Sequence, residues 1–168
     1  KIRTIPDFPK KGIMFRDITT LLQDPEGLRE VIKKLVERYK DQKIDVVAGI
    51  EARGFILGGI LAYELGVGFV PLRKKGKLPY KTESITYDLE YGTDILEIQR
   101  DALESGSRVL MIDDLLATGG TAQAACKLVE MLGGKIVKVL FLVELPELGG
   151  REKLYPYRVD SLVEFSGH

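Results

Sequence analysis

Four short, largely apolar runs without regular alternation of polar side chains constrain this chain more than any other feature. They cover residues Ile44–Ile50, Gly68–Leu72, Arg108–Ile112 and Ile136–Val143. A strand covered on both faces carries such a run, whereas a strand with one face in water alternates apolar and polar residues. Helical patterns accompany these runs, so the sequence predicts an α/β fold with a central, mainly parallel sheet flanked by helices.

The helical patterns have recognisable ends. One helix begins at Asp24-Pro25-Glu26, which combines an N-cap acceptor, a proline where no N–H is needed, and an acid near the positive end of the helix dipole. From Leu28 to Tyr39 the apolar residues recur at the spacing of one helix face. Further helices are predicted over Gly54–Leu65, ended by Gly66, and over Thr121–Leu132.

The segments that follow the predicted strands are where a ligand is expected, because open parallel sheets bind ligands at the carboxyl ends of their strands. These segments are residues 51–54, 73–84 and 113–121. The second is a basic loop that contains glycine and proline. After it, Ile85–Glu90 and Asp94–Gln99 are predicted to pair as a hairpin.

The composition excludes several classes of protein. The 168 residues suit a single domain, predicted over residues 1–168, and 25 basic against 25 acidic residues leave no net charge to attract nucleic acid or an anionic membrane. One cysteine and one histidine exclude a disulfide framework, a Cys-clustered zinc site and, unless the terminal His168 folds back, a Ser-His-Asp triad. No run is long enough to span a membrane, and we expect a cytoplasmic protein without nucleic-acid or membrane partners.

The most informative stretch runs from Val109 to Thr121. A buried strand delivers Asp113 and Asp114 to its carboxyl end, and a small turn with glycines and threonines then opens a helix. Such turns bind phosphate, because glycines let backbone N–H groups approach an anion and the helix N-terminus adds partial positive charge. Two carboxylates beside a phosphate suit a cis-diol or a magnesium ion. A ligand with both a phosphate and a ribose diol would satisfy both halves.

Other phosphate-binding motifs do not fit the chain. A P-loop carries a lysine before its final serine or threonine, and Gly119-Gly120-Thr121 has none. Gly66-Val67-Gly68 lacks the third glycine of a dinucleotide-binding fingerprint. The remaining alternative is an ordinary strand-to-helix turn with two solvated acids.

The stretch Val109–Thr121 resembles the 5-phosphoribosyl 1-pyrophosphate (PRPP) motif of the type I phosphoribosyltransferases, and within them the branch that acts on adenine. Other segments are similar to that branch in order along nearly the whole chain: Phe15–Ile18, Glu51–Phe55, Arg73–Pro79, Leu89–Gly92 and Leu142–Leu145. The resemblance implies the type I phosphoribosyltransferase fold. It also implies transfer of the phosphoribosyl group from PRPP to adenine, giving AMP and pyrophosphate, with Mg²⁺ as cofactor.

The resemblance further implies which residues hold PRPP. Asp113 and Asp114 would bind the ribose hydroxyls and place negative charge near a developing oxocarbenium cation. The 5-phosphate would lie against Ala117, Thr118, Gly119, Gly120 and Thr121.

The leaving pyrophosphate is expected to have its own set of residues: Glu51, Ala52, Arg53, Arg73, Lys74 and Lys77. Arg53 is also expected to act in catalysis, and the family has a cis peptide where this chain has Glu51–Ala52. Mg²⁺ would be held mainly by PRPP and water, with no direct protein ligand. Taken alone, Arg53 could be a helix-start arginine in a surface ion pair, and the lysines a solvated loop.

For the base, the family implies a catalytic carboxylate at Glu90. Attack through N9 of adenine requires a proton to leave the ring, and Ala117 stands where enzymes for 6-oxopurines carry an Asp. From sequence alone Glu90 is one acid in a hairpin. The adenine site would comprise Met14, Arg16, Leu115 and Leu145.

Parts of the chain are expected to cover the ligands. Residues 1–22 would form a hood over the base, and the basic loop and hairpin at 73–99, which include Tyr91, would close as a lid and exclude water. Part of the basic loop would approach the neighbouring site in a homodimer. Two other functions stay open: transfer to another purine base, or a regulator that senses PRPP without catalysis.

Overall fold

The computed structural model describes residues 1–89 and 91–167. Its main sheet contains β3 (Val46–Ile50), β4 (Gly68–Lys74), β5 (Thr82–Asp88), β6 (Thr93–Gln99), β7 (Arg108–Leu116), β8 (Lys135–Glu144) and β9 (Val159–Glu164). The strand order is β5-β6-β4-β3-β7-β8-β9. Strands β4, β3, β7, β8 and β9 are parallel, and the β5–β6 hairpin joins β4 antiparallel at one edge. The predicted α/β architecture is therefore confirmed.

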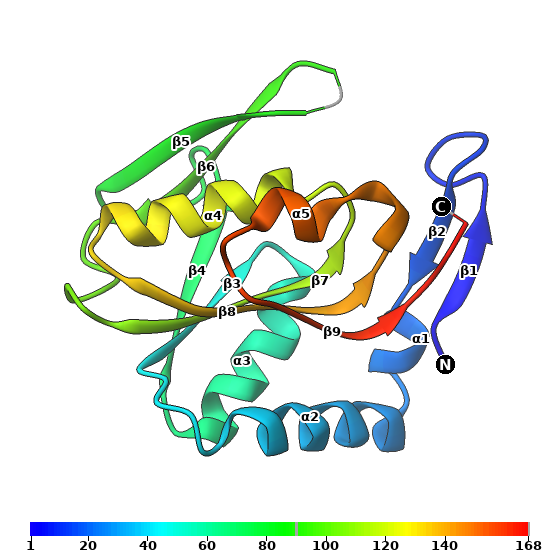
Figure 1. The fold of residues 1–168 in the computed structure, drawn as a ribbon, viewed down its shortest axis with the longest axis horizontal. Helices are drawn as coiled ribbons and strands as arrows, with labels where there is room; N and C mark the ends of the chain where they lie inside the picture. The colour runs from blue at the N-terminus through cyan, green and yellow to red at the C-terminus, as the bar shows by residue number, and fades with distance from the viewer. Residues whose placement is uncertain (90, 168) are drawn as a thin grey trace.

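Helices cover both faces of this sheet (Figure 1). On one face lie α2 (Pro25–Tyr39) and α3 (Arg53–Leu65), and on the other lie α4 (Gly120–Met131) and the short α5 (Gly150–Leu154). The Asp24 side chain caps α2 by accepting from the Glu26 N–H at 3.2 Å, as its sequence predicts. Gly66 ends α3 in the left-handed conformation that glycine adopts readily.

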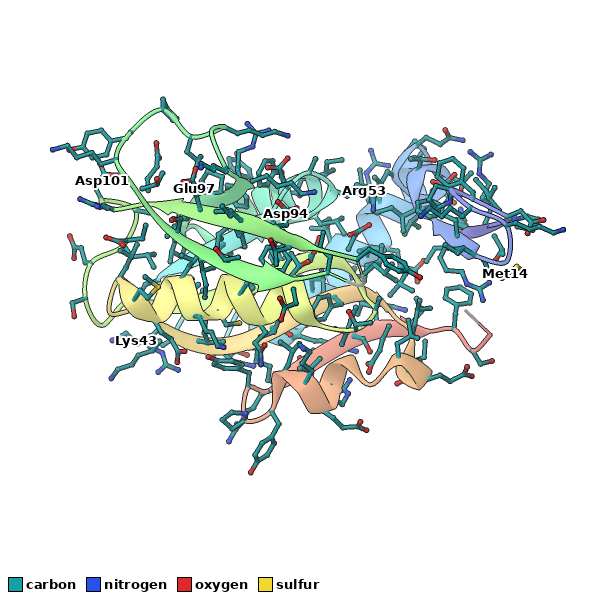
Figure 2. The ribbon with its side chains drawn as sticks, turned by 90° about the horizontal axis from the view of Figure 1, so that it is seen from above. Met14, Lys43, Arg53, Asp94, Glu97 and Asp101 are labelled. Carbon is teal, nitrogen blue, oxygen red and sulfur yellow. The ribbon has the colours of Figure 1, made fainter. Side chains whose placement is uncertain are left out.

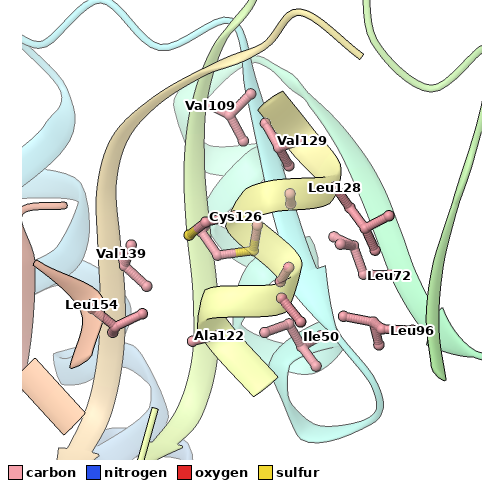
Figure 3. Close-up of a cluster of buried hydrophobic side chains, with 14 of the residues drawn as sticks. Ile50, Leu72, Leu96, Val109, Ala122, Cys126, Leu128, Val129, Val139 and Leu154 are labelled. Atoms are coloured by element: carbon pink, nitrogen blue, oxygen red, sulfur yellow. The ribbon is translucent and has the colours of Figure 1, made fainter. Parts of the chain in front are cut away.

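Strand β7 shows why the sheet needs apolar side chains on both faces. Val109 and Met111 belong to the cluster beneath α4, whereas Leu110 and Ile112 belong to the cluster beneath α2 and α3. Figure 3 shows the first cluster, in which Cys126 is fully buried. Burial raises the pKa of the Cys126 thiol to about 12, so this cysteine stays protonated at neutral pH.

Three strands extend two or more residues beyond their predicted ends, and in each the added residues pair with a distant strand. Strand β7 does not stop at Ile112 but continues to Leu116, because its hydrogen-bonded partner β8 continues alongside to Glu144. Strand β4 extends to Lys74, which pairs with Leu96. Strand β5 begins at Thr82, so the expected loop 73–84 shrinks to a turn over residues 75–81. The hairpin itself is confirmed.

A second, two-stranded sheet lies apart from the main one, formed by β1 (Arg3–Pro6) and β2 (Met14–Asp17). It leads into α1 (Thr19–Leu22), and Ser166 and Gly167 lie beside it, where their carbonyls accept from Arg16 on β2. Asp17, the last residue of β2, joins the small sheet to α1. Its carboxylate accepts hydrogen bonds from the Thr19 hydroxyl at 2.7 Å and from Arg3 Nε at 2.6 Å. Hydrogen bonds from Thr19 and Arg3 lower the pKa of Asp17 to about 2. Within the described ranges, no helix combines the length and apolar character needed to cross a membrane.

Candidate active site

The order in which the chain adds strands to the sheet reverses between β3 and β7. From β3 the chain moves outward to β4 on one side, and β7 then takes the place on the other side of β3. Loops that leave two such strands diverge, which opens a crevice at their carboxyl ends where α/β proteins bind ligands. The predicted segments 51–54 and 113–121 both lie at this point, so the structure brings them together.

The corner between β3 and α3 contacts β7 directly. Arg53 Nε donates a hydrogen bond to Asp114 Oδ2, and Asp114 is only 7% exposed. Gly54 makes this approach possible, since a Cβ at that position would lie 3.0 Å from the Ile112 carbonyl oxygen. The Glu51–Ala52 peptide is cis, as the family resemblance implied.

Glu51 gathers the basic turn around itself. Its carboxylate accepts from the Lys74 N–H at 2.6 Å and from Lys77 Nζ at 2.9 Å, and Arg73 Nε lies 3.5 Å away. Burial raises the pKa of Glu51, but the hydrogen bonds from Lys77 and Lys74 outweigh it and leave the pKa lowered. Three of the predicted pyrophosphate residues therefore meet at one acid.

Lys74 and Arg73 each show a further feature. The Lys74 ammonium lies 3.1 Å from Asp94 on β6, and this contact raises the pKa of Lys74. The Arg73 guanidinium lies 5.8 Å from the centre of the Phe55 ring. In the part of the chain that the structure describes, Arg73 Nε is a buried donor without a hydrogen-bond acceptor. A buried donor of this kind suits an anionic ligand.

The loop between β7 and α4 surrounds a small cavity. The cavity has a volume of about 110 Å³, and its lining consists of Asp113, residues 115–122 and Phe141. The first N–H groups of a helix have no acceptor within that helix, so the start of α4 offers donors here. Gly119 precedes α4 with a φ of 89°. All five predicted phosphate residues, 117–121, thus lie on one cavity beside Asp113.

The two adjacent aspartates differ in environment. Asp114 is paired with Arg53, whereas Asp113 Oδ1 accepts the Asp114 backbone N–H at 2.8 Å. Burial and the neighbouring Asp114 charge raise the pKa of Asp113 well above its usual range. A carboxylate in this situation is stabilised by any ligand that donates hydrogen bonds to it, as ribose hydroxyls do.

The predicted base residues are divided between the hood and the end of the sheet. Figure 2 shows Met14 on the β1–β2 hairpin, where it is 37% exposed. The Arg53 guanidinium lies 5.8 Å from the centre of the Phe15 ring, so the hood contacts the β3–α3 corner. Leu115 and Leu145 pack in one cluster beneath this junction.

Arg16 is bound to the C-terminal segment. Its Nη2 donates to the carbonyl oxygens of Ser166 at 3.0 Å and Gly167 at 2.9 Å, and its guanidinium lies 4.8 Å from the centre of the Phe165 ring. Arg16 Nε is buried without a hydrogen-bond acceptor among the described residues.

The predicted catalytic residue Glu90 lies outside the described residues. Its neighbour Tyr91 is 83% exposed at the end of the β5–β6 hairpin. The Asp88 carbonyl oxygen at the end of β5 lies close to the loop 117–121, because a Cβ at Gly120 would lie 3.6 Å from it. The fold therefore brings Asp88, at the end of β5, to the loop that lines the cavity with Asp113.

Comparison with known proteins now decides the family. The profile of the Phosphoribosyl transferase domain matches residues 17–167, which is most of the chain. This chain belongs to the phosphoribosyltransferases.

Within the phosphoribosyltransferases, this chain is similar to adenine phosphoribosyltransferases. The adenine phosphoribosyltransferase of Parvibaculum lavamentivorans is 60% identical over 169 residues, which cover 99% of this chain and 97% of that protein. The adenine phosphoribosyltransferase of Nitrosospira multiformis is 57% identical and covers 100% of this chain and 97% of its own.

Solved structures of adenine phosphoribosyltransferases are similar to this chain in fold as well as in sequence. The adenine phosphoribosyltransferase of Thermoanaerobacter pseudethanolicus has a TM-score of 0.95 at 55% identity, covering 98% of this chain and 95% of that one. The Saccharomyces cerevisiae enzyme was solved with an imino-altritol bisphosphate and adenine. It has a TM-score of 0.90 at 43% identity, covering 95% of this chain and 93% of that one.

Sequence reasoning missed two residues that contact this candidate site. Asp94 pairs with Lys74, and Gly150 lies against the phosphate loop, where a Cβ at Gly119 would be 2.9 Å from the Gly150 carbonyl oxygen. No local pattern marks these contacts, since both join segments far apart in the sequence. The adjacent glycines Gly149-Gly150 were the one available signal of a close backbone approach.

Proposed function

We propose that this phosphoribosyltransferase transfers the 5-phosphoribosyl group from PRPP to adenine and releases AMP and pyrophosphate. One observation carries the proposal: the Asp113–Asp114 pair lies beside the glycine-rich loop 117–121 at the switch point of the sheet. A ribose phosphate presents a diol and an anion, and this site presents carboxylates and N–H donors to match them. The names of the relatives support adenine as the base.

In this assignment PRPP lies across both loops of the crevice. Asp113 and Asp114 accept hydrogen bonds from the ribose 2- and 3-hydroxyls. The 5-phosphate lies in the cavity formed by Ala117, Thr118, Gly119, Gly120 and Thr121. The pyrophosphate lies at the corner and basic turn, against Glu51, Ala52, Arg53, Arg73, Lys74 and Lys77.

Binding of pyrophosphate requires an exchange of partners. Lys77 and Arg73 lie at the Glu51 carboxylate in the free protein, and Lys74 lies at Asp94. A polyanion recruits Lys74 at small cost, because its pair with Asp94 is partly exposed and such pairs contribute about 0–1 kcal/mol. The Glu51 side chain is only 10% exposed, so Lys77 and Arg73 leave it only where the ligand offers them stronger negative charge. The side chains of Lys74 and Lys77 are 56% and 49% exposed, so both can turn toward a ligand.

The transfer breaks the bond between ribose C1 and a pyrophosphate oxygen and forms the bond between C1 and adenine N9. The electron pair of the broken bond leaves with the pyrophosphate, where Arg53 stabilises the developing charge. Negative charge at Asp113 and Asp114 favours the oxocarbenium character of C1 in the transition state. Glu90 accepts the proton that leaves the adenine ring, and Tyr91 closes over the site with the hairpin.

A magnesium ion fits this site as a companion of PRPP. Among the described residues there is no group of three His, Cys, Asp or Glu side chains arranged for a metal. Asp113 lines the cavity with oxygen donors of the kind Mg²⁺ prefers, while Asp114 is engaged by Arg53. As the family resemblance implies, we assign the ion mainly to the oxygens of PRPP and water, where it would neutralise pyrophosphate charge.

Adenine is assigned to the space between the hood and the sheet end. The main chain at Met14 reads the exocyclic amine, Arg16 lies beside the base, and Leu115 and Leu145 cover its faces. Arg16 Nη1 donates to Thr4 Oγ1 and Nη2 to the carbonyls of Ser166 and Gly167, whereas Nε has no acceptor among the described residues.

We assign the working state to a homodimer in the cytoplasm. The family resemblance implies the dimer, with part of the basic turn, in which Lys75 is exposed, near the neighbouring site. The cytoplasm is supported by the substrate, since PRPP is a polyanion that does not cross a bilayer unaided.

The experiment is a pyrophosphate-release assay with PRPP, Mg²⁺ and a panel of purine bases. Adenine offers a 6-amino donor and an N1 acceptor, and hypoxanthine reverses both. Buried hydrogen bonds can discriminate by roughly 10⁴-fold, so kcat/KM should favour adenine over hypoxanthine and guanine by about that factor. Equal use of hypoxanthine would assign another purine as substrate. PRPP binding without turnover of any base would indicate a sensor.

A further inference from the structure

Strand β8 ends in a buried acid that the proposed reaction does not use. Glu144 is 3% exposed, and Arg151 on α5 forms a fork on it, with Nη2 2.7 Å from Oε1 and Nε 3.2 Å from Oε2. The Ser161 hydroxyl on β9 donates to Oε1 at 2.8 Å. Arg151 Nη1 also donates to the Val159 carbonyl at 2.7 Å. One acid thus joins β8, β9 and α5.

The charge state of this acid is fixed at neutral pH. The hydrogen bond from Arg151 lowers the pKa of Glu144 more than burial raises it. The same hydrogen bond raises the pKa of Arg151. Both groups are therefore ionised, and a two-pronged bond between ions fixes the direction of the arginine as well as its distance.

The neighbour of Arg151 lies against the proposed 5-phosphate loop. A Cβ at Gly150 would be 2.5 Å from the Ala117 carbonyl oxygen and 2.6 Å from Leu116 Cδ1. From the other side, a Cβ at Gly119 would be 2.9 Å from the Gly150 carbonyl oxygen. The two backbones are so close that no Cβ fits between them, so a shift of Gly150 would shift the loop 117–121 as well.

A hydrogen bond ties the two segments together at the strand ends. The Leu145 N–H, one residue after Glu144, donates to the Leu116 carbonyl at 2.9 Å. The segment 145–151 is therefore fixed at its first residue by β7 and at its last residue by Glu144. Between these points it carries Gly150 to the loop.

We propose that Glu144 and Arg151 are positioning residues that set the geometry of the 5-phosphate loop through Gly150. This inference rests on the proposed function, in which residues 117–121 bind the 5-phosphate. The pair touches no reacting atom. It keeps the N–H groups of the loop aimed at the phosphate before the ligand arrives, which lowers the cost of binding.

The same two strands offer a matched control pair. Lys138 on β8 lies 3.2 Å from Asp160 on β9, and the two side chains are 25% and 23% exposed. In the sheet Lys138 pairs with Leu110, whereas Glu144 pairs with Leu116 at the carboxyl end. Loss of the Lys138 pair removes an ion pair from the same strands without touching the phosphate loop.

The test measures the binding of AMP and of adenosine, which differ by the 5-phosphate alone, to the full-length protein by calorimetry. The variants are Glu144→Gln, Arg151→Lys and the control Lys138→Met. Arg151→Lys keeps the charge but not the fork. In the first two, AMP affinity should fall by about 10-fold to 10²-fold, because small misplacements of a site have effects of this size. Adenosine affinity should stay the same, and Lys138→Met should change neither.

Two outcomes separate the inference from the proposed function. Variants with a lower Tm and an unchanged ratio of AMP to adenosine affinity would overturn the positioning role. A wild-type protein that binds AMP no better than adenosine would instead refute the 5-phosphate assignment. If Glu144→Gln does not fold, Ser161→Ala replaces it, since it removes one bond to Oε1 and should shift the same ratio by a smaller factor.

Discussion

The β3–α3 corner and the β7–α4 loop lie side by side at the switch point, but different forces hold them. At the corner, charges pair with one another: Arg53 with Asp114, and Glu51 with Arg73 and Lys77. At the loop, shape decides, since Gly119 and Gly150 pack backbone against backbone around a cavity.

The difference shows how one crevice can bind two kinds of anion. Ion pairs at a partly exposed corner can exchange partners, which suits a pyrophosphate that must arrive and leave. A close-packed loop cannot rearrange without clashes, which suits a phosphate that stays attached to the sugar throughout the reaction. Substitutions at the corner and at the loop can test this division between charge and shape.

The largest effect is expected at Asp113. Asp113→Asn should lower kcat/KM for PRPP by about 10²–10³-fold, because it removes charge that stabilises the transition state. The same change should stabilise the free protein. Burial and the Asp114 charge raise the pKa of Asp113, which means that its ionised form is less stable in the folded protein than in the unfolded chain. A Tm higher by about 2–4 °C corresponds to roughly 1 kcal/mol at this chain length.

The sign of the Asp113 effect can be followed with pH. An acid with a raised folded pKa destabilises the protein as pH rises from its unfolded value, about 4, through its folded value. The Tm advantage of Asp113→Asn over wild type should therefore grow as pH rises above about 4. Asp114→Asn, which deprives Arg53 of its partner, should lower Tm instead. Equal Tm changes in both variants would contradict the distinction between the two acids.

The second effect tests shape. Gly119→Ala places a Cβ 2.9 Å from the Gly150 carbonyl at a φ of 89°, so the loop must move. We expect kcat/KM for PRPP to fall by about 10²-fold. The control is Gly66→Ala, which has a φ of 72° and open space around the new Cβ. It should cost about 1–2 kcal/mol of stability and leave kcat/KM unchanged.

The third effect tests exchange at the corner. Trypsin should cleave the free protein between Lys74 and Lys81, where the basic turn is exposed. PRPP with Mg²⁺ at ten times Kd should slow this cleavage about tenfold, because bound protein resists opening in proportion to ligand occupancy. The rate is measured by mass spectrometry of the fragments. Cleavage at the same rate with and without ligand would mean that the turn does not close on PRPP.

The smallest effect concerns Glu51 itself. Glu51→Gln removes the charge that holds Lys77 and Arg73, so tryptic cleavage of the free turn should rise about twofold to fivefold, the range for partly exposed ion pairs. Glu83→Gln is the control, because Glu83 pairs with Arg100 at 3.0 Å, outside the turn. If both variants cleave alike, the turn does not depend on Glu51.

The proposed site could be predicted from sequence where its residues are neighbours along the chain. Asp113, Asp114 and the loop 117–121 follow one apolar strand, and local chemistry is enough to indicate a phosphate and a diol. The residues at which the strands end could not be predicted in the same way. Asp113 lies inside β7 because β8 continues beside it, and no residue near Asp113 reports that partner.

The sequence by itself determined the layered α/β fold, the end of the sheet to which we assign the ligand, and the glycine- and threonine-rich chemistry of the loop 117–121. Each follows from periodicity or from a short run of residues, which act over local distances. Only the tertiary structure decided that Glu51 holds the basic turn, that Arg16 binds the C-terminal segment, and that Gly150 supports Gly119. Such contacts join segments up to about 150 residues apart, and their formation depends on how helices and strands pack rather than on any local pattern.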